Sequence, residues 1–261
     1  MIFAGCDIGS LTGEAVIVSN NSIISTHIIR IKSNPENSAF EVMTKALENT
    51  GLSFNDITYC CSTGYGRDKN PFSNLSISEI SCHGLGAHWL NKSIRTVIDI
   101  GGQDCKVISI DEKGMIIDFI MNDKCAAGTG RNLEILAKTI NIKLEDLGKL
   151  SLKSRKPLIL SNKCSVFMEL EVLQHLYSKK RINNIVHGIN DAVARRVACL
   201  AGAVDLQGEF AITGGVSKNI GVVKGLEEIL KIKFSPLPID PQLVGALGAA
   251  VFARNEALKL T

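Results

Sequence analysis

Residues 2–31 alternate between short apolar runs and polar turns. The segment IFAGCD ends in Asp7, a turn follows at Gly9 and Ser10, and a second apolar run covers Ala15–Val18. An Asn-Asn pair then precedes a third run that ends near residue 31. Short runs rich in β-branched residues and bounded by Asn, Gly and Asp predict strands joined by tight turns. The segment is therefore expected to form three strands.

Residues 96–121 repeat this plan. A strand ends in Asp99, turns at Gly101 and Gly102, and returns through Val107–Ile110 before the turn DEKG and a third run. A carboxylate at the tip of a strand followed by a glycine turn thus occurs twice, about ninety residues apart, which indicates an internal duplication. We therefore predict a first lobe at residues 1–94 and a second lobe at residues 95–261, each with one such turn.

Apolar residues recur at helical spacing between and after these strands. In the first such segment Phe40, Met43, Leu47 and Thr50 fall on one face, and Gly51 is placed to end the helix. A further turn, AITGGVSKN, follows another short apolar strand. The expected helices cover 37–51, 131–140, 166–177, 182–204 and 241–258.

Composition and charge describe a globular chain with little electrostatic preference. The 261 residues include 45% hydrophobic and 21% charged residues and 23 glycines, and the net charge is +3. The longest basic run is SKKR, so neither nucleic acid nor a membrane is an expected partner. With no export signal or membrane-length apolar run, we expect a cytoplasmic protein whose eight cysteines stay thiols.

Most of these cysteines lie in apolar runs and are expected to pack as small buried side chains. This group comprises Cys6, Cys60, Cys61, Cys105 and Cys199. Cys82 and His83 are adjacent and could form a metal-binding pair, although local packing is the more common role for such a pair.

The glycine turns suit a nucleotide. DIGS and DIGGQD would present backbone N–H groups to a phosphate chain, because small residues allow close approach. Asp7 and Asp99 could hold Mg²⁺ through water, and the turn TGGVSKN could lie against a ring or a ribose. Neither the P-loop pattern nor the dinucleotide pattern G-x-G-x-x-G occurs. Three ordinary glycine hairpins are the alternative interpretation.

Two further cysteines stand at the start of helical patterns. Cys125 lies in NDKCAAGTGR and Cys164 in SNKCSVF. The positive end of a helix dipole favours the thiolate. Two thiolates cannot complete a four-coordinate site, but a two-fold dimer would bring four together, which suits a [4Fe–4S] cluster or zinc. Two inert thiols are the third possibility.

The order of the motifs resembles a known family. GCDIGS, STGYGR, SEISCH, VIDIGGQDCKVI, MNDKCAAGTGR, TGGVSKN and VGALGAA resemble the ATP-dependent activators of 2-hydroxyacyl-CoA dehydratases. Their wider family includes the ATPase subunits of benzoyl-CoA reductase. The resemblance covers nearly the whole chain. It implies an α/β fold of the duplicated ribonuclease-H-like, bilobal type shared by actin, Hsp70 and sugar kinases.

The resemblance implies a homodimer that binds ATP or ADP with Mg²⁺ and shares one [4Fe–4S] cluster through Cys125 and Cys164. ATP would change the angle between the helices beside the cluster and drive one electron into a 2-hydroxyacyl-CoA dehydratase or a related iron–sulfur reductase. Ferredoxin or flavodoxin would supply the electron. Gln103 and Asp104 are candidates for positioning water and Mg²⁺. The expected nucleotide contacts are Asp7, Gly9, Ser10, Leu11, Thr12, Asp99, Gly101, Gly102, Gln103, Gly128, Thr129, Gly130, Gly214, Gly215 and Val216.

One position departs from the family pattern. Glu14 stands in the first turn region where many members carry a lysine, and a glutamate would repel phosphate. Two other classes are kept as alternatives. A sugar-type kinase on the same scaffold could use Asp104 as a base toward a hydroxyl, and an actin-like or chaperone-like ATPase would bind other proteins.

Overall fold

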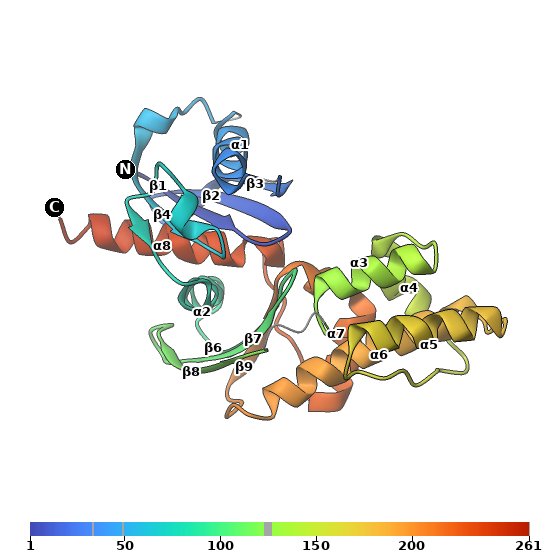
Figure 1. The fold of residues 1–261 in the computed structure, drawn as a ribbon. Coiled ribbons are helices and arrows are strands. Elements are labelled where there is room, and N and C mark those ends of the chain that lie inside the picture. Colours follow the sequence, from blue (N-terminus) through green and yellow to red (C-terminus); the bar gives the residue numbers. More distant parts are fainter. Residues whose placement is uncertain (33, 49, 123–126, 261) are drawn as a thin grey trace.

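The computed structural model describes residues 1–32, 34–48, 50–122 and 127–260. Two mixed sheets organise the chain (Figure 1). The first has the order β3-β2-β1-β4-β5, and its strands are β1 Ile2–Ile8, β2 Thr12–Ser19, β3 Ser22–Arg30, β4 Ile57–Thr63 and β5 Leu75–Ser76. The second has the order β8-β7-β6-β9, and its strands are β6 Ile94–Ile100, β7 Cys105–Ile110, β8 Ile116–Met121 and β9 Glu209–Thr213.

Both sheets are built on the same plan, which confirms the predicted duplication of the fold. In each, the first strand pairs antiparallel with the second and parallel with a later one: β1 with β2 and β4, and β6 with β7 and β9. β6 and β7 are almost entirely buried, as continuous apolar runs predict, whereas the outer strand β8 exposes most of its residues.

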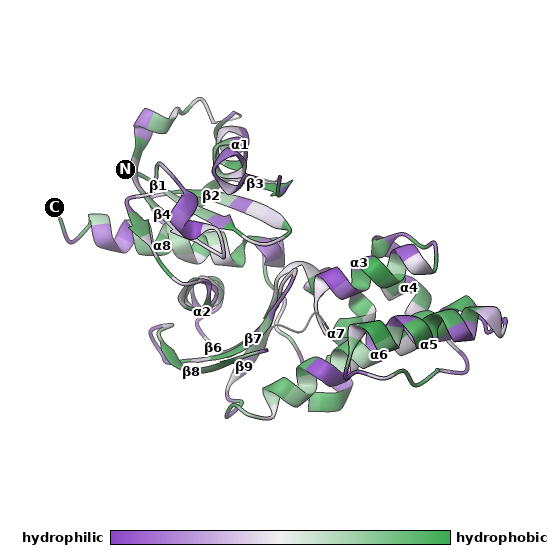
Figure 2. Cartoon of the chain, in the orientation of Figure 1, coloured by the Kyte–Doolittle hydropathy of each residue, from purple (hydrophilic) through white to green (hydrophobic). Residues whose placement is uncertain are grey.

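Helices cover the sheets and form a separate group beside the second sheet (Figures 1 and 2). They are α1 Pro35–Leu47, α2 Glu79–Leu90, α3 Gly130–Thr139, α4 Leu147–Ser151, α5 Ser165–Tyr177, α6 Ile182–Ala201, α7 Ile220–Leu230 and α8 Val244–Ala257. Short 3₁₀ turns cover Phe54–Asp56, Arg67–Lys69, Leu144–Asp146, Gly215–Lys218 and Pro241–Leu243. Within the described residues, no helix has both the length and the apolar character that crossing a bilayer requires.

The first predicted helix begins and ends earlier than its sequence pattern indicated. The Asn34 side chain accepts hydrogen bonds from the backbone N–H groups of residues 36 and 37, and Pro35 occupies the first turn. Met43 and Leu47 are buried as expected, but Phe40 is 43% exposed and packs its ring edge-on against Phe72. The helix ends at Leu47, so neither Thr50 nor Gly51 belongs to it.

α2 and α8 cross between the two sheets, and their contact joins the two halves of the molecule (Figure 1). A Cβ added at Gly248 would overlap the backbone carbonyl of Cys82, and one at Gly86 would overlap that of Val244. α8 also packs on β1, where an added Cβ at Gly5 would overlap the α8 backbone. The C-terminal helix, which lies in the predicted second lobe by sequence, therefore contributes to the core of the first sheet.

Candidate active site

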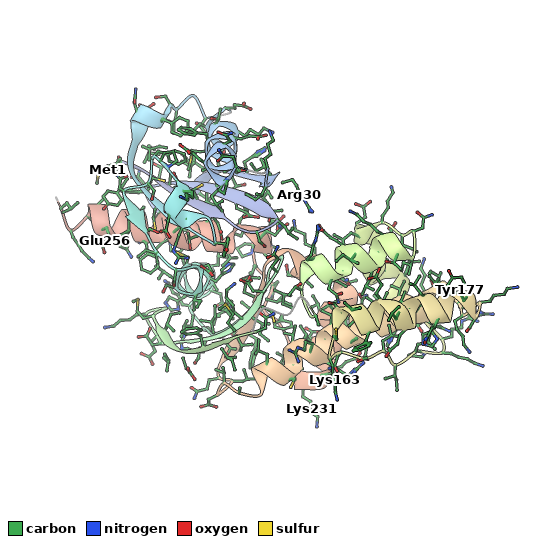
Figure 3. The ribbon with its side chains drawn as sticks, in the orientation of Figure 1. Met1, Arg30, Lys163, Tyr177, Lys231 and Glu256 are labelled. Atoms are coloured by element: carbon green, nitrogen blue, oxygen red, sulfur yellow. The ribbon has the colours of Figure 1, made fainter. Side chains whose placement is uncertain are left out.

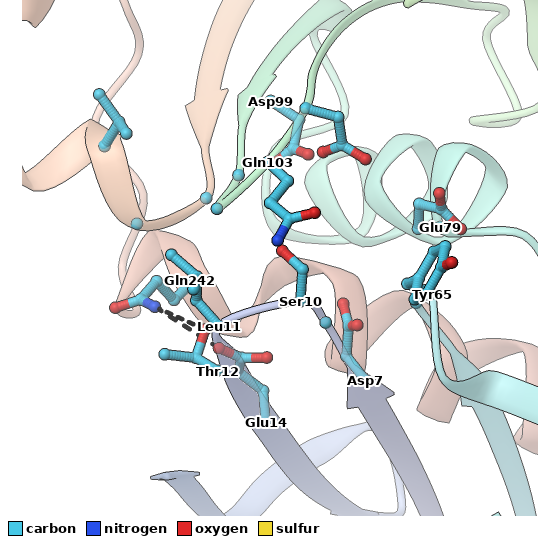
Figure 4. Close-up of a pocket in the computed structure, with 18 of the residues that line it drawn as sticks. Asp7, Ser10, Leu11, Thr12, Glu14, Tyr65, Glu79, Asp99, Gln103 and Gln242 are labelled. Carbon is cyan, nitrogen blue, oxygen red and sulfur yellow. Dashed lines mark hydrogen bonds between the residues drawn. The ribbon is translucent and has the colours of Figure 1, made fainter. Parts of the chain in front are cut away.

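A cavity of 640 Å³ lies where the turns of the two sheets meet (Figure 4). Residues from both halves line it, so neither lobe forms it alone. The predicted site residues that line it are Asp7, Gly9, Ser10, Leu11, Thr12, Asp99, Gly101, Gly102, Gln103, Asp104, Gly214, Gly215 and Val216. The topology thus brings together all three glycine turns that the sequence singled out.

The first two turns have the same internal hydrogen bond. The Gly9 N–H donates to the carbonyl of Thr12 at 3.0 Å, and the Gly101 N–H donates to that of Asp104 at 2.9 Å. The turns also touch, because a Cβ at Gly102 would lie 2.6 Å from Cγ of Leu11. Glycine at 102 therefore lets the first turn pack directly on the second.

The predicted contacts at Gly128, Thr129 and Gly130 do not line the cavity. Thr129 is fully buried and precedes α3, and the Gly130 N–H donates to the carbonyl of Gly101 at 2.9 Å. The Arg131 N–H donates to the carbonyl of Gly102 at 2.8 Å. The first amides of α3 are thus bonded to the second turn, and the nucleotide contact expected for this segment stays a prediction.

Asp99 is held by three side chains. It accepts a hydrogen bond from Oγ1 of Thr213 at 2.9 Å and one from Nζ of Lys106 at 3.4 Å, and Nδ1 of His83 lies 3.6 Å from its Oδ1. Burial raises the pKa of Asp99, but the neighbouring His83 and Lys106 and the hydrogen bonds outweigh it, so the pKa is lower than usual. The surroundings of Asp99 therefore hold its carboxylate ionised.

Asp7 behaves differently although it occupies the equivalent strand tip. Burial raises the pKa of Asp7 to about 6, since the opposing effect of His83 offsets the burial only in part and Asp99 adds repulsion. The backbone of Gly245 at the start of α8 lies against the Asp7 carboxylate, and a Cβ there would be 2.9 Å from Nε2 of His83. One imidazole thus lies near both aspartates.

Two glycines with a left-handed backbone lie against these aspartates. Gly64 follows β4 with φ of +86°, and Gly214 follows β9 with φ of +79°. A Cβ at Gly64 would overlap the Asp7 carboxylate, and one at Gly214 would lie 2.8 Å from Oδ1 of Asp99. The STG and ITG segments that end in these glycines are therefore a second repeat, which the sequence interpretation did not identify.

Several cavity residues were missed by the sequence analysis. Lys106 is buried, with Nζ 2.8 Å from Oδ1 of Asp104, and Glu79, His83 and Tyr65 complete the side of the cavity near Asp7. His83 thus reaches the site instead of serving only in local packing with Cys82. The spacing of Lys106 from Asp99 equals that of Glu14 from Asp7, and this repeat could have identified Lys106.

Glu14 lies inside the cavity rather than on its rim. It pairs in register with Asp7, is 5% exposed, and has a pKa raised well above its usual value by burial and by the Asp7 charge. Nε2 of Gln242 lies 3.5 Å from its Oε1 and 3.4 Å from Oγ1 of Thr12 (Figure 4). This glutamine beside α8 therefore contacts the first turn.

An ion pair joins the first sheet to α3 at the mouth of the cavity. Arg30 lies at the end of β3 (Figure 3). Its two terminal nitrogens lie 2.5 and 3.0 Å from the carboxylate oxygens of Glu134. Arg131 contacts the same carboxylate at 3.2 Å. α3 is thus bonded to the second turn at its start and to the first lobe one turn later.

The thiols divide into buried and accessible groups. Cys6, Cys60, Cys61 and Cys105 are buried as expected, and Cys82 is buried too, but Cys199 is exposed, so its predicted burial is wrong. Cys164 lies at the N-cap of α5, as predicted. Its side chain is half-buried and lines a second cavity with Lys163 and Phe167.

The other predicted cluster ligand, Cys125, lies outside the described residues. Within the described ranges, no three His, Cys, Asp or Glu side chains are placed to hold a metal ion.

Cys164 has the chemistry expected of a ligand to an anionic cluster. Its thiol is accessible, and it stands at the N-terminus of a helix, where the dipole stabilises negative charge. The two aspartates likewise fit Mg²⁺, which takes one or two carboxylates and completes its shell with phosphate oxygens and water. Both groups therefore have suitable residues on this chain.

The raised pKa of Asp7 predicts a pH-dependent stability. The folded protein binds this proton with a pKa of about 6, whereas an unfolded aspartate has a pKa of about 3.9. Raising the pH from about 4 to about 6 therefore removes stability, and the loss is complete above that window. We expect Asp7→Asn to raise the free energy of unfolding, with a gain about 2 kcal/mol larger at about pH 7.5 than at about pH 4.5.

Urea denaturation of the nucleotide-free protein at the two pH values measures this difference. At each pH, the free energy of unfolding of the wild type is subtracted from that of the variant. This subtraction removes the contribution of every group that titrates equally in both proteins. An equal gain at both pH values would contradict the raised pKa of Asp7.

Comparison with known proteins agrees with this geometry. A family model described as the BadF/BadG/BcrA/BcrD ATPase family matches residues 4–253. The 2-hydroxyisocaproyl-CoA dehydratase activator of Clostridioides difficile is 39% identical over 257 residues, which cover 98% of this chain and 96% of that protein. The activator of lactoyl-CoA dehydratase from Anaerotignum propionicum is 40% identical over 263 residues, which cover 99% and 100%.

Solved structures give the same result. The activator of the 2-hydroxyisocaproyl-CoA dehydratase from Clostridium difficile with bound ADPNP matches with a TM-score of 0.94 at 39% identity, covering 100% of this chain and 97% of that chain. A ROK family glucokinase from Streptomyces griseus, in complex with glucose and AMPPNP, has a TM-score of 0.62 at 14% identity and covers 98% and 100%, a likeness that extends to the fold alone. This chain belongs to the BadF/BadG/BcrA/BcrD ATPase family and has its duplicated actin-like α/β fold.

Proposed function

We propose that this protein is an ATP-dependent activator that donates an electron to an enzyme of the 2-hydroxyacyl-CoA dehydratase type. Relatives named as dehydratase activators match nearly the whole chain, and a relative from Thauera aromatica at 30% identity is named as part of benzoyl-CoA reductase. The observation that carries the proposal is the direct bonding of the second glycine turn to the start of α3. A nucleotide held by that turn acts on the helix that follows Cys125.

The nucleotide lies between the two hairpin turns. Backbone N–H groups of the DIGS and DIGGQD turns bind its phosphates, and the turn at Gly214–Val216 faces the adenosine. Asp7 and Asp99 would hold Mg²⁺ through water. Gln103 extends between Asp99 and Ser10 (Figure 4) and positions the attacking water together with Asp104.

Nucleotide state is transmitted through α3. The Arg30–Glu134 ion pair fixes this helix to the first lobe, while Gly130 and Arg131 fix it to the second turn. A change in the angle between the lobes therefore moves α3 relative to the rest of the helical group. Such a change follows nucleotide state only if ATP and ADP differ in their affinity for the two arrangements.

The thiols of Cys125 and Cys164, with their equivalents in a second copy, would hold one [4Fe–4S] cluster between the subunits of a homodimer. A bound cluster of this kind supplies one electron at low potential. Val166, Phe167 and Leu170, on α5 beside Cys164, are 62%, 63% and 50% exposed and provide an apolar surface for the second subunit. Ferredoxin or flavodoxin in the cytoplasm supplies the electron.

Iron and sulfide analysis after anaerobic purification tests the proposal, with EPR of the reduced protein. We expect about four irons per dimer, lost in both Cys125→Ser and Cys164→Ser. Cys199→Ser is the matched control, because Cys199 is an exposed thiol on α6 and should leave the iron content unchanged. A dimer that stays iron-free after anaerobic reconstitution, yet phosphorylates a sugar with ATP, would overturn the activator and favour the kinase.

A further inference from the structure

The two hairpins at the cavity are equivalent residue by residue but carry opposite charges at one position. In the first, Asp7 pairs in register with Glu14, and in the second, Asp99 pairs in register with Lys106. Both Glu14 and Lys106 line the same cavity, and both are almost fully buried, at 5% and 2% exposure. The duplication thus offers two equivalent places for a cation, and this chain uses the second.

The cavity needs a cation if it is to take a polyphosphate. Among the described residues, seven acidic ones line it: Asp7, Glu14, Glu79, Asp99, Asp104, Glu134 and Glu145. A triphosphate adds further negative charge, which Mg²⁺ offsets only in part. Glu14 cannot offset the charge of a phosphate, because its side chain supplies no positive charge.

Lys106 is the best placed of the cations that line the cavity. Arg30 is held by both oxygens of Glu134, and Lys218 lies 2.5 Å from Asp240. Lys106 lies between Asp99 at 3.4 Å and Asp104 at 2.8 Å, beside the second turn. Its ammonium has three donors, and the Asp104 side chain is 41% exposed, so this carboxylate can turn to solvent without being left buried and unpaired.

We propose that Lys106 binds the terminal phosphate of ATP and so replaces, from the second hairpin, the lysine that Glu14 excludes from the first. Asp99 keeps the ammonium in place, while Asp104 gives up its contact when the phosphate arrives. The exchange leaves the Asp104 carboxylate free to face the attacking water. This inference rests on the proposed nucleotide site and names the side chain that distinguishes ATP from ADP.

Binding of Mg·ATP, Mg·ADP and adenosine by calorimetry tests the proposal. We expect Lys106→Gln to weaken ATP binding at least about tenfold and ADP binding less, with adenosine affinity unchanged. Lys106→Arg should keep most of the ATP affinity, because it retains the charge. In the double variant Glu14→Lys with Lys106→Gln, the lysine on the first hairpin should restore ATP affinity to within about threefold of wild type.

The wild-type protein is titrated with the same three ligands. The proposed nucleotide site and the proposed role of Lys106 can therefore fail separately. A wild type without affinity for ATP overturns the nucleotide site and Lys106 together. A wild type that binds ATP, beside a Lys106→Gln variant that binds it equally well or loses adenosine and ATP equally, overturns only Lys106. If Lys106→Gln does not fold, the variant Asp104→Asn tests the proposal instead. It removes the charge that Lys106 contacts, so ATP binding should tighten at least about threefold while adenosine binding stays the same. Unchanged ATP binding by Asp104→Asn overturns the proposal.

Discussion

Gly248→Ala is expected to lower the free energy of unfolding by about 3 kcal/mol, the upper end of what overfilling a packed interior typically costs, because here backbone must move. The added methyl group would overlap the carbonyl of Cys82, which belongs to the backbone of α2 and cannot rotate away. α2 and α8 would have to separate, and both sheets pack on these helices. For a chain of this size the loss corresponds to a fall in melting temperature of roughly 6–12 °C.

Gly202→Ala is the matched control for this substitution. Gly202 follows α6 with φ of −66°, an ordinary helical value, and its nearest neighbour to an added Cβ is 3.5 Å away. It should leave the melting temperature nearly unchanged or raise it slightly, since alanine restricts the unfolded chain. Calorimetry or circular dichroism melts of the two variants measure the difference. Equal effects would mean that the helix crossing adjusts without cost.

The strands and turns could be predicted because their chemistry is local. Asp7 and Asp99 end apolar runs and precede glycines, and each hairpin closes through a hydrogen bond between residues three apart. The duplication followed from comparing these two segments. It also implied that the two turns face one cavity, which the structure confirms.

The remaining site residues depend on contacts between segments far apart in sequence. His83 lies on α2 and Gln242 precedes α8, yet both reach the cavity, because α2 and α8 cross beside it. No local pattern marks Gln242 as part of a site, and His83 was noted only as a possible metal-binding partner of the adjacent Cys82. Lys106 is the exception, since its register opposite Asp99 follows from the position of the hairpin turn.

Local patterns did not show what the segment before α3 contacts. The resemblance implies nucleotide contacts at Gly128, Thr129 and Gly130, and in the structure the amide of residue 130 donates to the carbonyl of Gly101. A glycine-rich stretch indicates close backbone approach without saying what approaches. Cys199 sits in an apolar helical run, and only its position on the outward side of α6 decides its exposure.

Asp99→Asn is expected to lower the rate constant for ATP hydrolysis at least about a hundredfold, the loss typical of removing one electrostatic group from a catalytic site. The surroundings of Asp99 lower its pKa, so the fold holds it ionised. An amide has nearly the same shape and still accepts the hydrogen bond of Thr213, but it loses the charge that fixes Lys106 and that would hold Mg²⁺ in the proposed site. Binding of adenosine should not change, because the turn at Gly214–Val216 stays in place.

The contrast with a surface aspartate of the same sheet separates this effect from a general loss of charge. Asp118 lies on the outer strand β8, and its exposed side chain accepts a hydrogen bond from the N–H of Phe119. Because this side chain does not line the cavity, the Asp118→Asn variant should hydrolyse ATP at the wild-type rate. Phosphate release by both variants, with Mg²⁺ in excess, measures the difference. If Asp99→Asn kept more than about a third of the wild-type rate, the ionised carboxylate would not be the metal anchor. Hydrolysis would then depend on Asp7, whose raised pKa would make the rate fall steeply below about pH 6.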